Sequence, residues 1–205
     1  MRDIQDTWAK KAKLEGFKSR ASYKLIQIDD KHKLIQKASS ILELGSAPGG
    51  WSQVISKRKN SSCACKAIDI LPMDKVEGID FIQLDLYAKG FSELIQSEKK
   101  DIDLILSDMS VNLSGIKLVD DESNKDLNYF CLELSKTALS KSGALLIKTF
   151  NNQNLKQLKK EFMSSFHQVF LEKPPASKTS SAEVYLLGLI LSLIHISEPT
   201  RRIHI

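Results

Sequence analysis

The chain has 205 residues, a net charge of +5 and a hydrophobic content of 42%. These values suit one domain with a single core and exclude an intrinsically disordered chain. No apolar run reaches the roughly 18 to 20 residues that a membrane-spanning helix needs, and no charged-then-apolar leader opens the chain, so we expect a soluble cytoplasmic protein without a membrane partner. The cysteines and histidines lack the spacing of a metal site or of a disulfide framework, so we predict free thiols and no bound metal. We further expect the protein to be monomeric.

The charge is unevenly distributed along the chain. Residues 1–33 carry a net charge of +4, residues 34–147 of −3 and residues 148–178 of +4. Basic ends around an acidic centre favour a protein that meets a polyanion with its ends and a cofactor with its centre. Solvated lysine faces without a partner are the alternative.

Hydrophobic periodicity predicts two N-terminal helices, at residues 2–15 and 21–30. From residue 41, predicted strands at 41–44, 64–70, 81–84, 102–106 and 144–147 alternate with predicted helices at 50–57, 91–97, 127–141 and 155–165, and Asn154 is expected to cap the last helix. This alternation is typical of an α/β fold with a mostly parallel, doubly wound sheet. Residues 169–171 and 183–189 then form two strands without a helix between them, so they should pair antiparallel.

The last residues of the chain differ from the rest. Residues 191–201 read LSLIHISEPTR, which matches the translation of a transposase-adapter sequence used in DNA library preparation. We therefore expect a single native domain over residues 1–190, including basic helices at 1–33, and a non-native tail at 191–205. A genuine C-terminal extension with a turn at Pro199 is the alternative.

A glycine-rich turn follows the strand predicted at 41–44. The segment 41–52 reads ILELGSAPGGWS and includes Gly45, Gly49 and Gly50. In doubly wound folds, such a turn lets a nucleotide approach the backbone because glycine has no side chain. The glycine spacing, with Pro48 inside the turn, is not that of a dinucleotide fingerprint, which disfavours an NAD-dependent dehydrogenase. A plain strand-to-helix turn is the alternative.

Carboxylates end the next two predicted strands. Asp69 closes the second strand and Asp85 follows the third. A carboxylate at the end of the second strand can accept hydrogen bonds from both hydroxyls of a ribose, and Asp85 could accept one from an exocyclic amine. Either residue alone could be a solubilising strand end. Together with the glycine turn, they predict a nucleoside site.

Seven short motifs occur in a fixed order along the chain. They are SRASYKL (19–25), LGSAPGGWSQ (44–53), DILPMD (69–74), SDMS (107–110), NLSG (112–115), IKTF (147–150) and SAEVY (181–185). On these motifs the chain resembles the FtsJ/RrmJ (RlmE) family of ribosomal RNA 2′-O-ribose methyltransferases, which use S-adenosyl-L-methionine (AdoMet), over nearly the whole length to Leu189. The resemblance implies a Rossmann-like AdoMet-dependent methyltransferase fold with an antiparallel late strand.

The resemblance implies a catalytic tetrad of Lys24, Asp108, Lys148 and Glu183. A ribose 2′-hydroxyl is a weak nucleophile that must lose its proton as it attacks the methyl group, so a nearby base is useful. A lysine serves as that base only where burial or a second cation favours its neutral form. In the family reading, Lys148 takes the proton, Lys24 supplies the second charge and the carboxylates orient both amines. Taken singly, each residue could instead be solvated, snorkel or cap a turn.

The family's AdoMet contacts carry over to five residues: Gly49, Trp51, Asp69, Asp85 and Asp108. Trp51 has an alternative reading as a packing residue at the start of a helix. The sequence alone does not decide between the two.

Two basic groups are expected to contact RNA phosphates. The N-terminal group is Arg2, Lys10, Lys11, Lys13, Lys18 and Arg20, and the C-terminal group is Lys156, Lys159, Lys160, Lys173 and Lys178. The chain departs from the family at Val111, at the pair 151–152, and at 178–180, where arginines are common. Since lysine cannot form the forked phosphate contacts of arginine, the last change concerns the strength of RNA binding.

The sequence therefore predicts an AdoMet-dependent RNA 2′-O-methyltransferase that acts on large-subunit ribosomal RNA, at a uridine in the A loop, on assembled or assembling ribosomal subunits. A 2′-O-methyltransferase for tRNA or for an mRNA cap is the alternative enzyme. A non-catalytic RNA-binding factor for ribosome assembly is the alternative from another class, which the intact tetrad disfavours.

Overall fold

The computed structural model describes residues 3–97, 101–111 and 115–192. Its helices are α1 (Asp3–Leu14), α2 (Ala21–His32), the short 3-10 helix η1 (Ile35–Lys37), α3 (Gly50–Arg58), α4 (Lys89–Ser97), α5 (Lys117–Ala138) and α6 (Leu155–Ser165). Its strands are β1 (Ser40–Leu44), β2 (Ala64–Asp69), β3 (Asp80–Gln83), β4 (Ile102–Ser107), β5 (Leu139–Phe150), β6 (Phe166–Glu172) and β7 (Glu183–Leu191).

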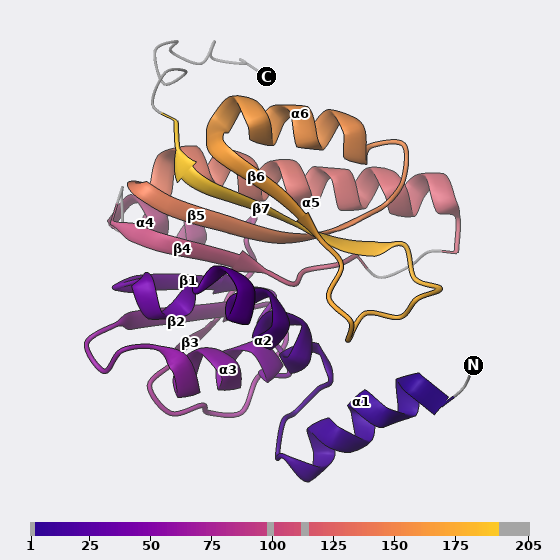
Figure 1. The fold of residues 1–205 in the computed structure, drawn as a ribbon. Coiled ribbons are helices and arrows are strands. Elements are labelled where there is room, and N and C mark those ends of the chain that lie inside the picture. The colour runs from indigo at the N-terminus through magenta and orange to yellow at the C-terminus, as the bar shows by residue number, and fades with distance from the viewer. Residues whose placement is uncertain (1–2, 98–100, 112–114, 193–205) are drawn as a thin grey trace.

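The strands of the described chain form one seven-stranded sheet in the order β3-β2-β1-β4-β5-β7-β6 (Figure 1). Among themselves, the first five strands along the chain, β1 to β5, pair in parallel. β7 runs antiparallel to both β5 and β6 because a loop at residues 173–182, and not a crossover helix, joins β6 to β7. The predictions of a doubly wound α/β sheet and of antiparallel late strands are therefore confirmed.

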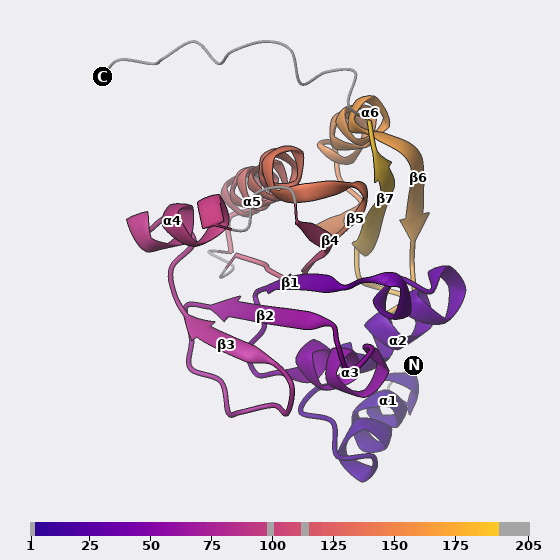
Figure 2. The same ribbon diagram turned by 90° about the vertical axis from the view of Figure 1, so that its left-hand side faces the viewer.

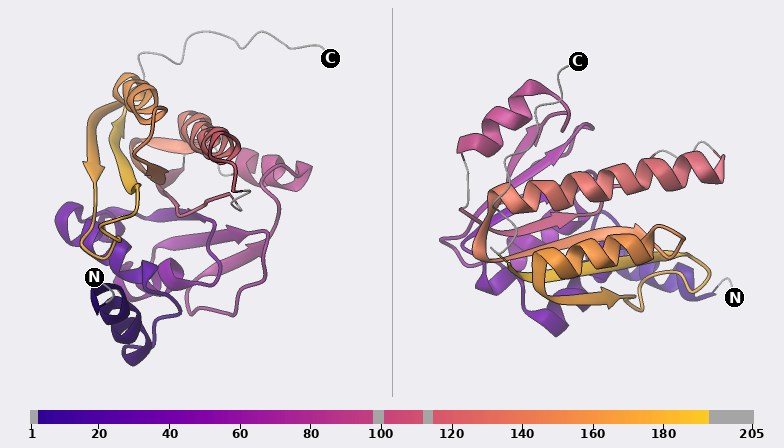
Figure 3. Two further views of the ribbon diagram at one scale, coloured as in Figure 1. Left: turned by 90° about the vertical axis from the view of Figure 1, so that its right-hand side faces the viewer. Right: turned by 90° about the horizontal axis from the view of Figure 1, so that it is seen from above.

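Helices cover both faces of the sheet (Figures 1 and 2). One core cluster packs α2 and α3 against the sheet, with Leu25 and Ile55 fully buried. The other cluster packs α4, α5 and α6 against the opposite face, with Phe162 fully buried, and the view from above shows these three helices side by side (Figure 3). This two-sided burial explains why the central strands are almost continuously apolar.

Helix α1 stands away from the sheet and packs on α2 (Figure 1). Its Ala12 is buried against Tyr23 and Ala176, and Trp8 and Phe17 complete this small cluster. The N-terminal basic segment is thus anchored by aromatic side chains, while most of its lysines stay exposed.

Several element boundaries differ from the sequence-based predictions. Helix α5 begins ten residues earlier than expected, at Lys117, and ends at Ala138 because Leu139 already pairs with Ile102 in the sheet. Asn154 occupies the cap position of α6 but makes no capping hydrogen bond, since its side-chain amide donates to the carbonyl of Asp121. Because the residues before 127 are mostly charged and polar, hydrophobic periodicity did not reveal the start of α5.

The end of β7 lies one residue beyond the predicted domain boundary at 190. Leu191 is buried and pairs with Phe166, and the next amide, Ser192 N, donates to Ser165 O. Ile190 has a positive φ of 60°, which is unusual for a β-branched residue. Residues 193–205, which make up most of the predicted non-native tail, lie outside the described residues, so the prediction for them stays a prediction.

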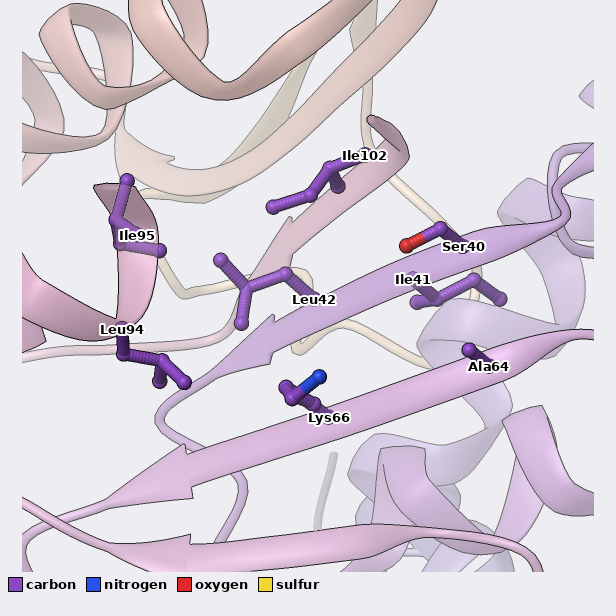
Figure 4. A pocket seen from close by; sticks show the side chains of 8 residues that line it. All are labelled: Ser40, Ile41, Leu42, Ala64, Lys66, Leu94, Ile95 and Ile102. Atoms are coloured by element: carbon purple, nitrogen blue, oxygen red, sulfur yellow. The ribbon is translucent and has the colours of Figure 1, made fainter. Parts of the chain in front are cut away.

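A small hollow lies between β1, β2, β4 and α4, and Lys66 extends into it among apolar side chains (Figure 4). It is lined by Ser40 and Ala64, the first residues of their strands, so it sits at the opposite end of β1 from the glycine turn. None of the predicted site residues lines this hollow. No helix in the described part of the chain is long and apolar enough to cross a membrane.

Candidate active site

The carboxyl ends of four neighbouring parallel strands meet at one edge of the sheet. The glycine turn follows β1, Asp69 ends β2, Asp85 lies shortly after β3 and Asp108 follows β4. In open α/β sheets, ligands bind at this edge, in the crevice where the strand order reverses. The structure therefore brings most of the predicted cofactor residues to the edge where a nucleoside would bind.

The glycine turn has a backbone that other residues would not easily adopt. Gly45 and Gly49 have φ values of 73° and 108°, and the bond between Ala47 and Pro48 is cis. A Cβ on Gly45 would lie 2.5 Å from the Cγ of Met109. Glycine is thus required both for the left-handed conformation and for the close approach of the chain after β4.

The carboxylate of Asp69 holds two loops in place. Its Oδ2 accepts a hydrogen bond from the backbone N–H of Ala47 at 2.8 Å, and its Oδ1 accepts one from that of Leu71 at 2.8 Å. Asp85 makes a similar turn contact, since its Oδ1 accepts from Tyr87 N at 2.9 Å. A carboxylate oxygen can accept more than one hydrogen bond, so these contacts orient both carboxylates and leave room for a ligand.

Trp51 and Ser46 test how well the turn fits the predicted cofactor. The indole of Trp51 is buried in the core and donates its N–H to the carbonyl of Ala21 at 2.9 Å. Any cofactor contact at Trp51 must therefore come from its backbone, and the side chain has the packing role considered above.

Ser46 has a buried hydroxyl without a hydrogen-bond partner among the described residues, and the apolar Ile70 and Leu71 are exposed beside Asp69. An unpaired hydroxyl beside exposed apolar side chains fits a nucleoside with polar substituents.

Two lysine–carboxylate pairs lie next to this edge. Lys24, in the first turns of α2, contacts both carboxylate oxygens of Glu183 at the start of β7, at 2.7 and 2.8 Å. Both side chains are mostly buried, at 8% and 15% exposure. The pKa of Glu183 lies below its usual value: burial opposes this, but hydrogen bonds and charge from Lys24, with smaller contributions from Ser177 and Lys148, outweigh it. Glu183 is therefore ionised at neutral pH.

Lys148, near the end of β5, forms the second pair with Asp108. Its ammonium lies 3.2 Å from Oδ1 of Asp108 and also donates to the backbone carbonyl of the same residue. A single residue thus satisfies two of the three donors of the amine. Within the described part of the chain, the third donor position remains for another hydrogen bond.

Tyr185 joins the two pairs. Its hydroxyl lies 3.1 Å from Oδ1 of Asp108 and 3.4 Å from Oε1 of Glu183, and the residue is fully buried. Burial and the two nearby carboxylates raise its pKa well above the usual value, so the hydroxyl keeps its proton and donates. The structure therefore brings all four predicted tetrad residues together.

The sequence analysis did not single out Tyr185, although a tyrosine among the apolar residues of β7, two positions after Glu183, was a usable signal.

Glu43 is a second residue of this region that sequence analysis missed. Its side chain lies on the face of the sheet that α2 and α3 cover, and it is 1% exposed. It accepts a hydrogen bond from the hydroxyl of Ser52 of α3. Burial raises the pKa of Glu43 to about 8; the Ser52 hydrogen bond opposes this rise, and the charges of Asp108 and Asp69 add to it. An acidic residue inside the apolar run ILEL was the available signal.

The family model and the curated relatives agree on one family. Residues 17–191 match the model of the FtsJ-like methyltransferases. The chain is 38% identical over 190 residues to the ribosomal RNA large subunit methyltransferase E of Azoarcus sp., covering 92% of this chain and 93% of the relative. It is 39% identical to the enzyme of that name from Legionella pneumophila, with coverages of 90% and 91%. A solved ribosomal RNA methyltransferase from Plasmodium falciparum superposes with a TM-score of 0.72 at 28% identity, covering 85% of this chain and 98% of that one.

Glu43→Gln should change how stability depends on pH. Folding raises the pKa of Glu43 from 4.5 to about 8, so its contribution is fully present below the lower value and is lost as the pH rises through the higher one. Between these values, the variant should gain about 1.4 kcal/mol of unfolding free energy per pH unit relative to the wild type. Glutamine can still accept the Ser52 hydrogen bond.

Urea unfolding in mildly acidic and mildly alkaline buffer measures this difference. Glu93→Gln, at an exposed position of α4, is the matched control and should follow the wild type at both pH values. Parallel pH dependence in Glu43→Gln and the wild type would contradict the assignment of a raised pKa to Glu43.

Proposed function

Because the chain belongs to the FtsJ-like methyltransferase family, we propose that it methylates the ribose 2′-oxygen of a uridine in the A loop of large-subunit ribosomal RNA. It is an RNA methyltransferase and AdoMet is its methyl donor. The observation that carries the proposed chemistry is the pair of lysine–carboxylate contacts joined by Tyr185 beside the glycine turn. The relatives named above support the choice of ribosomal RNA and of the large subunit, which the enzyme would meet in the cytoplasm.

The cofactor would be held at the carboxyl edge of β1, β2, β3 and β4. The backbone at Gly49 and Trp51 and the carboxylates of Asp69, Asp85 and Asp108 are the proposed contacts. When bound there, AdoMet supplies an electrophilic methyl group on a sulfonium centre. The negative side chains at this edge favour that positive charge.

Lys148 is the proposed base for the ribose hydroxyl. Among the described residues, its amine is held by Asp108 through one carboxylate oxygen and one carbonyl, which leaves one position for the 2′-hydroxyl. In the neutral form, the amine accepts the proton of this hydroxyl as the oxygen attacks the methyl group, and it then carries the positive charge that Asp108 stabilises.

Lys24 has a different role in this proposal because its contacts differ. Both oxygens of Glu183 bind its ammonium, which holds this group in one place. A fixed cation beside the ribose stabilises negative charge that develops on the 2′-oxygen as its proton leaves. Since both lysines are held in place before the substrate arrives, most of the rate gain comes from positioning and electrostatics.

The structure separates the predicted RNA-binding lysines into two classes. Some make internal contacts: Lys18 pairs with Asp74 at 2.9 Å, and Lys173 donates to the carbonyl of Ser181 at 2.9 Å. In contrast, Lys156, Lys159 and Lys160 are exposed on one face of α6 and have no ion-pair partner within the described ranges. Residues at these spacings share a helix face. Helix α6 begins five residues after the end of β5, so this face borders the carboxyl edge and suits a run of RNA phosphates.

Labelled AdoMet should place its methyl group on the large ribosomal subunit. Incubation of the protein with isolated subunits, followed by mapping of 2′-O-methyl positions, should identify one uridine of the A loop, because the substrate is ribosomal RNA. Naked ribosomal RNA and tRNA are the comparison substrates. Label on tRNA alone would overturn the proposed substrate, and no transfer to any RNA would support the assembly-factor alternative.

Lys148→Ala should reduce methyl transfer by on the order of 100-fold or more, since it removes the proposed base. Binding of AdoMet and of subunits should be retained, as measured by calorimetry and filter binding. Lys141→Ala, at an exposed position near the other end of β5, is the control and should keep full activity. Unchanged transfer by Lys148→Ala would exclude Lys148 as the base.

Replacing Lys156, Lys159 and Lys160 together by glutamine should weaken subunit binding and reduce its salt dependence. Loss of three phosphate contacts should lower the slope of log affinity against log salt by roughly 2 to 3. The control triple, Lys33, Lys37 and Lys141 to glutamine, removes the same charge at the opposite edge of the sheet. Equal weakening in both triples would indicate a net-charge effect and contradict a contact at α6.

A further inference from the structure

The loop between β6 and β7, residues 173–182, contacts both helix α2 and Glu183 at the start of β7. It projects from the sheet beside α2 and α1 (Figure 1). Its base is closed by Lys173, whose ammonium donates to the carbonyl of Ser181. Pro174, Ala176 and Ser177 are buried although they belong to a loop. Such burial is unusual for a surface connection and indicates a segment that is held in one conformation.

Ser177 contacts the carboxylate of the first tetrad pair. Its hydroxyl donates to Oε1 of Glu183 at 3.1 Å, and the same oxygen lies 2.7 Å from the ammonium of Lys24. The residue is 7% exposed, so water does not readily replace this hydrogen bond. The contact fixes the orientation of the carboxylate and therefore the position of the amine that it holds.

Gln27 joins the loop by a hydrogen bond to the helix that carries Lys24. The side-chain Oε1 of Gln27 accepts a hydrogen bond from the backbone N–H of Ala176 at 2.9 Å. Gln27 lies three residues after Lys24 on the same face of α2. Within one turn, α2 is thus joined to the loop at Gln27 and to the start of β7, directly after the loop, at the Lys24–Glu183 pair.

Helix α1 supports the loop from outside. The buried Ala176 packs against Ala12 and Tyr23, beside Trp8 of α1. The match to the family model begins at residue 17, so α1 lies outside it. The N-terminal helix therefore contributes to the packing of the loop as well as to the basic surface.

We infer that Ser177 is a positioning residue for the Lys24–Glu183 pair, and that Gln27 and α1 keep Ser177 in place through Ala176. This inference rests on the proposed role of the pair in methyl transfer. Ser177 acts through Glu183 and does not touch the reacting atoms. Loss of its hydroxyl should free the carboxylate to rotate and should misplace the Lys24 ammonium beside the ribose.

Charged groups around Glu183 affect its pKa, and a change in this pKa would reveal the loss of the Ser177 hydroxyl. Lys24 of α2 and Lys148 of β5 lower the pKa of Glu183, together with the Ser177 hydrogen bond, against the opposing effect of burial. Asp108, which follows β4, reaches Glu183 only through the hydroxyl of Tyr185. Removal of the serine hydroxyl takes away one contact that favours the carboxylate, so the pKa of Glu183 should rise.

Ser177→Ala tests the inference, with Ser180→Ala as the matched control in the same loop, where the serine is exposed. We expect kcat to fall about tenfold in Ser177→Ala, with the KM for AdoMet and for subunits and the melting temperature close to those of the wild type. The Ser180→Ala variant should match the wild type. Gln27→Ala should lower kcat in the same direction because it releases the loop from α2.

Two further measurements separate positioning from a general structural role. Carbon-13 NMR of labelled glutamate carboxyls should show a raised pKa for Glu183 in Ser177→Ala but not in Ser180→Ala, with the signal assigned by Glu183→Gln. In a Glu183→Ala background, Ser177→Ala should cause no further loss of kcat. An unchanged titration of Glu183 or an unchanged kcat in Ser177→Ala would overturn the inference. Full activity in Glu183→Ala would instead overturn the role of the pair in the chemistry, while the titration still decides whether Ser177 holds Glu183.

Discussion

The antiparallel pairing of β5 with β7 is the constraint on which the catalytic edge depends. In this register Lys148 lies opposite Tyr185, and Phe150 lies opposite Glu183. Side chains of directly paired residues lie on the same face, and a slip of one residue would move them to the other face. The amine of β5 and the tyrosine of β7 therefore reach the same carboxylate, that of Asp108, only in this register. The long, mostly buried ladder between these strands makes the register secure.

The first helices connect this edge to the glycine turn. The hydroxyl of Ser22 donates to the carbonyl of Gly50, and the indole of Trp51 donates to the carbonyl of Ala21. The start of α2, which carries Lys24, is thus hydrogen-bonded to the start of α3, which follows the turn. The glycine turn and Lys24 are consequently positioned by one unit, in which the side chain of the tryptophan packs in the core.

Acidic side chains gather at this edge, and each is accommodated in a different way. Glu183 is paired with a lysine, Asp69 accepts backbone N–H groups, and Glu43 has a raised pKa because burial favours its neutral form. Buried carboxylates are tolerated only when paired, hydrogen-bonded or neutral. The neutral hydroxyl of Tyr185 then links the two ion pairs without adding charge. The site therefore keeps a negative character where a sulfonium would bind and holds two amines where a ribose would bind.

The order and type of the strands and the glycine turn could be predicted from the sequence, because they depend on local periodicity and on motifs of short range. The four residues of the proposed tetrad followed from the resemblance to the family. Periodicity did not locate the start of α5 or the full length of β5, since packing against the sheet and the pairing of Leu139 with Ile102 determine them. The roles of Tyr185, Glu43 and Ser177 also escaped prediction, and the choice between the two readings of Trp51 had to await its burial, since each follows from contacts between residues distant in sequence or from burial. The sequence by itself determined which chemical groups the chain carries and in which order. Only the tertiary structure decided which of them are buried, paired and oriented, because the strand register and the docking of α2 bring residues 24, 108, 148 and 183 together from four separate elements.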